Sequence, residues 1–398
     1  MLVQFTFKNV LSFKEETTLD MTAINAYKEH ESNLISNNHK EKLLRVAAIY
    51  GANASGKSNL CVAMQYFQSI IRESLNNSDK KENTIIRTLC NPFSFENGNK
   101  ENSEFQIVKV IKGFEYQYGF EYNADYIVKE WLYRKKLQTS RNTTIFERTT
   151  EKVEFGASVR RECVLYKRQI PAETLVLSFF NKLKLKTDIF ESVYKEFMEI
   201  LIAPSDFGED RSLLEQLLPQ VIDNDKKKLL EFLTAIDTGI DDIEYDDSEK
   251  DIKFTTIHVG KDGEKYPLNL FFESEGSIKS IVLFICARSA VETNHLMVVD
   301  ELNTKLHPLL LKFIIDLFYD ESSMGQLIYT THDTTLLDKR FFRRDQIWFV
   351  QKDEFGYSEL VALSDFKVRT DASFEKDYLA GVYGGIPLLK GFTMKEVK

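Results

Sequence analysis

The chain has 398 residues, with 52 Lys and Arg against 61 Asp and Glu, and its formal net charge at pH 7 is -9. Hydrophobic residues make up 43% and aromatic residues 12% of the sequence, which excludes a disordered protein. The acidic balance excludes a protein that coats nucleic acid through bulk charge, although it does not exclude a local basic surface. The length predicts two or three structural units.

Neither a membrane segment nor a disulfide framework is indicated. No apolar run reaches the ~18–20 residues that a membrane span needs, and residues 1–5 lack the layout of a signal peptide. The four cysteines are scattered without a Cys-x-x-Cys pair, which also argues against a zinc knuckle: Cys61, Cys90, Cys163 and Cys286. We therefore expect a cytoplasmic protein with reduced thiols and no membrane contact.

The first elements lead to a glycine-rich loop. Residues 4–13 alternate as a strand, residues 17–24 form its expected hairpin partner, and residues 44–50 are typical of a short buried strand. Residues 51–58, GANASGKS, then match the P-loop pattern G-x-x-x-x-G-K-[ST] without a mismatch. A helix is expected next, because apolar residues recur at helical spacing at Leu60, Met64, Phe67 and Ile71.

This loop predicts the binding of ATP with Mg²⁺. Glycines allow backbone N–H groups to surround phosphates, and the N-terminus of the following helix adds positive potential. We expect Lys57 to reach the β- and γ-phosphates and Ser58 to bind Mg²⁺. The other expected nucleotide contacts are Gly51, Asn53, Ala54, Ser55, Gly56 and Asn59.

The middle of the chain predicts a sheet followed by helices. Residues 105–111, 114–122 and 127–133 indicate antiparallel strands, and the aromatic residues that alternate in the second strand favour a packed core over a base-stacking platform. Residues 173–236 have helical periodicity and form a predicted helical insertion, in which Pro204 and Pro219 are expected to separate helices. The insertion would divide an N-terminal ATPase lobe, 1–172, from a C-terminal lobe, 237–398.

Basic residues form several short clusters along the chain. Each cluster alone is typical of a solvated face of a helix or loop. The clusters are 134–136, 160–161 with 167–168, 182–186, 226–228 and 343–344.

Two later strands carry further signals for a nucleotide. Residues 295–301, HLMVVDE, form an apolar run that ends in two carboxylates, as expected for a buried parallel strand that meets a nucleotide. Asp300 would hold Mg²⁺, and Glu301 would act as the base for the attacking water. The next apolar strand, 327–331, ends at His332, whose imidazole could hydrogen-bond the γ-phosphate. An Asp-Glu pair also ends many ordinary strands, but its place after a P-loop favours the catalytic role.

Two further segments belong to this series: the turn SEGS at 274–277 and the segment LHP at 306–308. In the order of these segments the chain resembles the ABC-type ATPases of the SMC, RecF and OLD group. Three further segments resemble a bacterial branch of stand-alone AAA-type ATPases, which is RloA-like and related to the AriA ATPase of the PARIS anti-phage system: 7–13, 344–348 and 383–387. The expected fold is therefore an α/β, ABC-ATPase-like P-loop fold with a mixed sheet, an antiparallel β subdomain and the helical insertion.

The resemblance implies roles for individual residues. Lys57 and Ser58 match the Walker A residues, Asp300 and Glu301 match the Walker B pair, and His332 matches the switch histidine. Residues 274–277 match the signature motif in part, which implies that Ser274, Gly276 and Ser277 contact the γ-phosphate bound by another subunit. A plain Ser-Gly turn remains the alternative for this segment. The glutamine that joins the metal site in ABC ATPases is not assigned, since Gln106 lies in a predicted strand.

The function implied by the resemblance is that of a sensor or scaffold in anti-phage defence by abortive infection. Such an ATPase would form a homodimer or a higher oligomer, respond to DNA or a phage protein, and control a separately encoded nuclease or toxin. Only about 65 residues follow His332, fewer than a nuclease domain of ordinary size. The alternative is a RecF-like DNA-binding ATPase of repair or maintenance, in which the helical insertion and the basic clusters embrace a duplex.

Two other classes fit the sequence less well. A transporter nucleotide-binding domain is disfavoured, because the signature is partial and roughly 240 residues separate the P-loop from Asp300. A GTPase is disfavoured because the nearest match to its guanine-reading Asn-Lys-x-Asp motif, at 181–184, ends in Lys184 in place of Asp.

Overall fold

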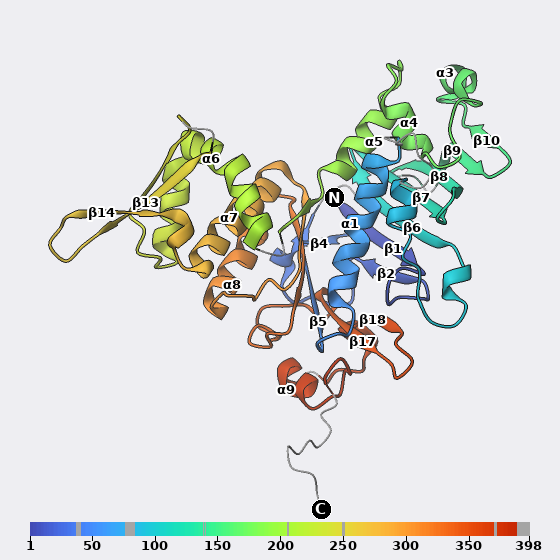
Figure 1. The fold of residues 1–398 in the computed structure, drawn as a ribbon. Helices are drawn as coiled ribbons and strands as arrows, with labels where there is room; N and C mark the ends of the chain where they lie inside the picture. Colours follow the sequence, from blue (N-terminus) through green and yellow to red (C-terminus); the bar gives the residue numbers. More distant parts are fainter. Residues whose placement is uncertain are drawn as a thin grey trace, which may run out of the picture.

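The computed structural model describes residues 1–36, 41–75, 84–137, 139, 141–204, 207–248, 251–369 and 372–387. The predicted loops around residues 37–38 and 76–83 lie outside or largely outside these ranges. Two large sheets lie on either side of one helix, and a smaller helical and β-hairpin region lies on the far side of the central sheet (Figure 1).

The central sheet has six strands in the order β11-β15-β16-β5-β17-β18. All of its pairings are parallel except β17 with β18. The four inner strands are apolar runs buried on both faces, as parallel sheets require. In chain order the strands are β5 (Val46–Gly51), β11 (Leu201–Ile202), β15 (Leu296–Val299), β16 (Gln326–Thr331), β17 (Ile347–Lys352) and β18 (Ser358–Ala362).

The second sheet is antiparallel, in the order β10-β9-β8-β7-β6-β1-β2. Its aromatic face is buried as predicted, since Tyr118, Phe120 and Tyr122 are all 0% exposed. The strands are β1 (Leu2–Lys8), β2 (Thr17–Asp20), β6 (Ser103–Ile111), β7 (Phe114–Tyr122), β8 (Ile127–Lys136), β9 (Thr143–Thr149) and β10 (Val153–Phe155).

Helix α1 (Lys57–Glu73) packs between these two sheets. Its Phe67 ring contacts aromatic rings of β1, β6 and β7, so the predicted apolar face of the helix meets the aromatic face of the antiparallel sheet. Alternate residues of β5 enter two different cores: Ala47 and Ile49 pack with α1, whereas Ala48 and Tyr50 pack with the helices on the other face. The P-loop therefore begins at the end of a strand that is fixed on both sides.

The other face of the central sheet is covered by helices (Figure 1). They are α7 (Glu275–Thr293), α8 (Pro308–Asp316) and α9 (Phe374–Leu379), and α6 (Phe207–Ala235) packs on the outer side of α7. A three-stranded sheet extends from this region, with β12 (Asp242–Asp246), β13 (Lys253–Val259) and β14 (Lys265–Asn269). The remaining short elements are β3 (Leu34–Ile35), β4 (Leu43–Leu44), α2 (Ile85–Thr88), α3 (Arg160–Cys163), α4 (Val176–Asn181) and α5 (Ile189–Met198).

Residues 173–236, for which the sequence predicts one helical unit, are divided between the two cores. Helices α4 and α5 pack against the antiparallel sheet and α1, whereas α6 packs against α7. The periodicity of the sequence identifies an apolar face but not the surface that covers it. Pro219 lies inside α6 and does not end it; the non-helical backbone lies at Asp225, with φ -146° and ψ 27°.

Within the described part of the chain, no helix combines the length and the hydropathy that a membrane crossing requires.

Candidate functional site

The carboxyl ends of three neighbouring parallel strands bring the predicted residues to one edge of the central sheet. Tyr50 of β5 lies opposite Thr331 of β16, and Tyr329 lies opposite Val299 of β15. The chain beyond each strand therefore starts from the same edge, with the P-loop after β5, the carboxylate pair after β15 and His332 after β16.

The P-loop is held in a form that can accept phosphate. Lys57 is 5% exposed, and its Nζ donates to the carbonyl oxygens of Gly51 at 2.8 Å and Ala52 at 2.9 Å. Gly56 precedes the helix with φ 114°, and a Cβ there would lie 2.4 Å from Ser358 Oγ. The buried Ser55 Oγ has no hydrogen-bond partner among the described residues. A glycine cradle, a buried ammonium and an unpartnered hydroxyl fit a bound phosphate.

Polar contacts from distant segments support this loop. Ser358 Oγ contacts Ser55 O at 2.6 Å and Ser12 Oγ at 2.8 Å, and Asn59 Nδ2 donates to Ser12 Oγ at 2.7 Å. The segment 7–13 thus braces the P-loop through Ser12. The amide of Asn59, which the sequence predicts at the nucleotide, is used in this brace, while Asn53 and Ala54 lie exposed at the tip of the loop.

The two carboxylates after β15 are positioned by the neighbouring strand. Thr330 Oγ1 donates to Asp300 Oδ1 at 2.5 Å and accepts from the backbone N–H of Glu301 at 2.8 Å. Burial lowers the pKa of the Lys57 ammonium, and the charges of Glu301 and Asp300 oppose this shift. Both carboxylates follow β15 at the sheet edge where β5 leads into the P-loop, so they lie on the same side of the sheet as Lys57.

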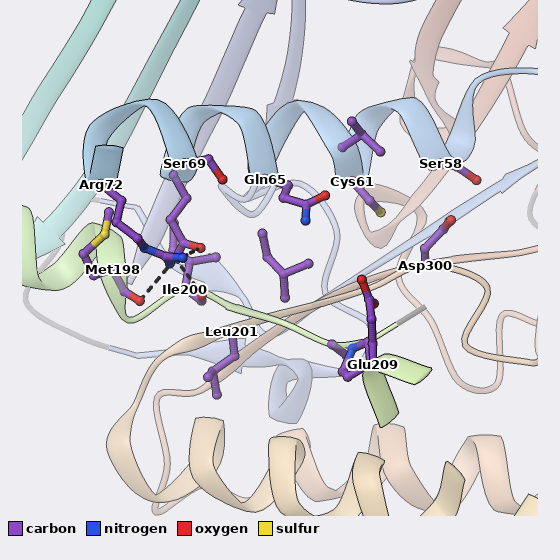
Figure 2. Close-up of a pocket in the computed structure, with 15 residues that line it drawn as sticks. Ser58, Cys61, Gln65, Ser69, Arg72, Met198, Ile200, Leu201, Glu209 and Asp300 are labelled. Carbon is purple, nitrogen blue, oxygen red and sulfur yellow. Dashed lines mark hydrogen bonds between the residues drawn. The ribbon is translucent and has the colours of Figure 1, made fainter. Parts of the chain in front are cut away.

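A cavity of about 470 Å³ runs from this edge along one face of α1 (Figure 2). Ser58 and Asp300 both line it, and their oxygens are hard ligands of the kind that Mg²⁺ prefers. Cys61 also lines the cavity, but burial raises the pKa of its thiol well above the usual value, and the charge of Asp300 adds to this shift. The thiol is therefore neutral and a poor metal ligand.

His332 lies at the exposed rim of this edge. Its Nε2 is 3.3 Å from Nδ2 of Asn303, and Asn303 Oδ1 accepts from Thr331 Oγ1 at 2.8 Å. Asn303 belongs to the loop that follows Glu301. The histidine is thus linked to the carboxylate loop through one amide, which allows a change at one to affect the other.

The turn at 274–277 lies apart from the P-loop. Ser274 is the N-cap of α7, where its Oγ accepts from Ser277 N at 3.0 Å and lies 2.9 Å from Ser277 Oγ. A Cβ at Gly276 would lie 2.9 Å from Lys305 O. The described contacts of this turn are with its own helix and with the loop around Lys305, so the described chain does not join it to Lys57.

Sequence reasoning predicted Ser58 but missed the rest of the polar face of α1. Positions 58, 61, 65, 68 and 72 recur at helical spacing and line the cavity with Glu209 of α6. That spacing is the signal that could have found them. Gln106, considered for the metal site and set aside, accepts hydrogen bonds from Gln117 and Trp131 within the antiparallel sheet.

One family of known proteins matches this chain over more than half of its length. The profile of a family described as "AAA domain, putative AbiEii toxin, Type IV TA system" matches residues 46–338. No curated protein matches the chain.

Solved structures with a similar arrangement include three SMC heads. An SMC head bound to the C-winged helix domain of ScpA has 12% identity and a TM-score of 0.43, over 95% of this chain and 99% of that chain. The SMC head domain from Thermotoga maritima has 14% identity and a TM-score of 0.38, over 91% and 98%. The head with an extended coiled coil from Pyrococcus furiosus, bound to the C-terminal domain of ScpA, has 12% identity and a TM-score of 0.42, over 96% and 99%. These likenesses are distant, and the fold assignment rests on the strand order and the P-loop.

Proposed function

We propose that this chain, which belongs to the AAA-domain family matched over residues 46–338, is an ATPase that uses bound ATP as a switch between two states of assembly. One observation carries the proposal. Lys57, Ser58, Asp300 and Glu301 come from segments far apart in the sequence and meet at one edge of the central sheet.

The described contacts suggest how these residues would act. Lys57 would exchange its bonds to the carbonyls of Gly51 and Ala52 for phosphate oxygens. Ser58 and Asp300 would hold Mg²⁺, which supplies the charge that stabilises the transferred phosphoryl group. Glu301, held through its backbone by Thr330, would take the proton of the attacking water.

Two further segments would make the site sensitive to the γ-phosphate. His332 would sense it at the rim, in contact with Asn303. The turn at 274–277 would contribute from a second subunit, because Ser274 is exposed and caps the N-terminus of a nineteen-residue helix. Closure by ATP would hold two copies together, and hydrolysis would release them.

The output of this switch would be a separately encoded toxin or nuclease in a bacterial anti-phage system. The description of the matched family as part of a toxin–antitoxin system supports this class of role. The resemblance of 7–13, 344–348 and 383–387 to RloA-like ATPases supports it further. The trigger would be DNA or a phage protein.

The test uses two substitutions and a measurement of mass in solution. Lys57→Ala should lose nucleotide binding, whereas Glu301→Gln should retain ATP, hydrolyse it very slowly and accumulate the assembled form. Light scattering on purified protein with and without ATP reports the mass. An unchanged mass for Glu301→Gln in saturating ATP would contradict nucleotide-driven assembly, and ATP binding by Lys57→Ala would contradict the site itself.

A further inference from the structure

Positive charge is concentrated in one part of this acidic chain. Residues 127–187, from the start of β8 to the loop before α5, contain fourteen Lys and Arg against six Asp and Glu, a net charge of +8. The whole chain has a net charge of -9, so the remaining residues carry -17. Such a separation of charge produces a surface potential of opposite sign at one end of the molecule.

Apart from four on β8, these basic residues belong to β9, β10, α3 and the loops around them, and these elements lie at the outer end of the antiparallel sheet (Figure 1). Two observations join the segments. The backbone N–H of Lys186 donates to Glu162 of α3 at 2.5 Å. The pKa of Glu154 is lowered by its hydrogen bond to Lys152 and also by the charges of Lys167 and Arg160. We call the exposed cations of this region the basic face: Lys152, Arg160, Arg161, Lys167, Arg168, Lys182, Lys184 and Lys186.

The loop after α4 directs three of these lysines outward. Leu183 and Leu185 pack against the core of the antiparallel sheet, so the residues between and beside them are exposed. Lys182, Lys184 and Lys186 therefore lie on the solvent side of the loop after α4. The packing of two leucines thus imposes a row of three like charges, which repel one another unless an anion lies nearby.

Within the described part of the chain, most of the basic face forms no ion pair with an acidic residue. Lys152 pairs with Glu154. Among the described residues, no ion pair involves Arg161, Lys167, Arg168 or the row at 182–186. The charges of Lys167 and Arg160 act on Glu154 without forming an ion pair in the described structure, and the six acidic side chains in this part of the sequence leave it with a net charge of +8.

The basic face also borders a hollow of about 820 Å³. Lys152, Lys167 and Arg168 line it together with Thr149, Tyr126 and one carboxylate, Glu151. Arg148 supports its floor, because its buried guanidinium donates to the carbonyls of Thr174, Pro171 and Ala172. The hollow therefore combines a rigid base with three cations, one carboxylate, a hydroxyl and an exposed aromatic ring.

We propose that the basic face binds the phosphate backbone of a nucleic-acid duplex. Unpaired Lys and Arg spread over several elements match a row of phosphates better than they match a small anion. The remaining surface, at -17, repels phosphate and so restricts binding to this end of the molecule. The surface does not include the P-loop, so the proposal is independent of the switch proposed above.

The experiment measures the anisotropy of a fluorescent 20-base-pair DNA duplex titrated with the full chain between about 50 and 200 mM salt. We expect binding that weakens steeply with salt. The double substitution Lys167→Glu and Arg168→Glu should weaken binding by about tenfold or more and reduce the salt slope by about 2. The matched control, Lys261→Glu and Lys265→Glu, reverses two exposed charges on the distant β13–β14 hairpin and should bind like the wild type.

Three outcomes would overturn the proposal. The first is that the wild type does not bind the duplex at the lowest salt concentration. The second is that the basic-face and control variants lose the same amount of duplex affinity. The third is that poly-glutamate, at an equal concentration of charge, displaces the duplex. The last result would assign the surface to acidic proteins. Circular dichroism of each variant keeps a folding defect separate from a binding defect.

Discussion

Thr330 of β16 is hydrogen-bonded to Asp300 at the end of β15, with 2.5 Å between Thr330 Oγ1 and Asp300 Oδ1. The same hydroxyl accepts from the backbone N–H of Glu301. Glu301 has φ 48°, a left-handed conformation that is unfavourable for a residue with a side chain. One buried hydroxyl therefore fixes both the expected metal-binding carboxylate and the strained residue that follows it.

Replacing Thr330 with Val should preserve the shape of the core but remove this hydroxyl. The N–H of Glu301 would lose its partner, at a cost of about 1–3 kcal/mol, and Asp300 would lose a positioning contact. We expect ATP hydrolysis to fall about 10–100-fold, as for other residues that orient metal ligands. The Mg²⁺ concentration for half-maximal rate should rise. Thr330→Ser keeps the hydroxyl and should stay within a few-fold of the wild type; equal losses in both variants would argue against the hydroxyl.

Two glutamines on the same face of α1 should behave differently. Gln68 is buried, and its Nε2 donates to the carbonyls of Phe197, Met198 and Ile200 at 2.9 to 3.1 Å. Gln65 is exposed and points into the cavity that Ser58 and Asp300 line (Figure 2). Gln68→Ala should lower the free energy of unfolding by about 1–3 kcal/mol, because the buried carbonyls of Phe197 and Ile200 lose their donor.

Gln65→Ala should leave stability within about 0.5 kcal/mol of the wild type and reduce the Mg²⁺-dependent hydrolysis of ATP. Urea unfolding and hydrolysis rates on both variants separate the two effects. Gln65 would supply the amide near the metal that the sequence alone did not assign. Full activity in Gln65→Ala would exclude it from that role.

The sequence could predict the parts of the site that are local, and it could not predict their supports. Residues 51–58 identify the P-loop because glycine, lysine and serine are needed at fixed spacing. Ser12 and Ser358 contact each other across 346 positions, and no periodicity relates them. The division of 173–236 was missed for the same reason, because a helical pattern shows an apolar face and not its partner.

A titratable pair next to the signature turn should make stability depend on pH. His258 Nε2 lies 2.7 Å from Oε1 of Glu273, the residue that directly precedes Ser274. This contact raises the pKa of His258 above 6.5. Because the folded pKa is raised, the pair stabilises the fold fully below about pH 6.5 and loses this contribution as pH rises through the folded pKa. The difference in Tm between wild type and His258→Gln should therefore be largest near pH 6 and shrink toward pH 8.5.

The control for this pair is Glu273→Gln, which removes the charge that favours the imidazolium. In a Glu273→Gln background, the difference in Tm between His258 and His258→Gln should no longer depend on pH. Because Thr256 Oγ1 also contacts Glu273 Oε1, a constant loss of stability is expected in that variant in addition. A difference in Tm that grows from pH 6 to 8.5 would show that the imidazolium does not stabilise the fold.

The buried pair Arg343 and Asp345 should matter for folding and not for hydrolysis. Arg343 is 0% exposed and donates through Nε and Nη2 to both oxygens of Asp345, at 2.9 and 2.7 Å. Its remaining donors hold the carbonyls of Ile24, Tyr27 and Glu29. The pair precedes β17, so it lies at the sheet edge opposite the P-loop.

Arg343→Met would leave the carboxylate of Asp345 buried without its cation, so the free energy of unfolding should fall by about 3–5 kcal/mol. Arg343→Lys should recover only part of this loss, because an ammonium cannot make the paired contact. Urea unfolding gives the stabilities, and ATP hydrolysis per folded molecule should remain near that of the wild type in both variants. A loss of hydrolysis without a loss of stability would place this pair in the catalytic pathway and refute its purely structural role.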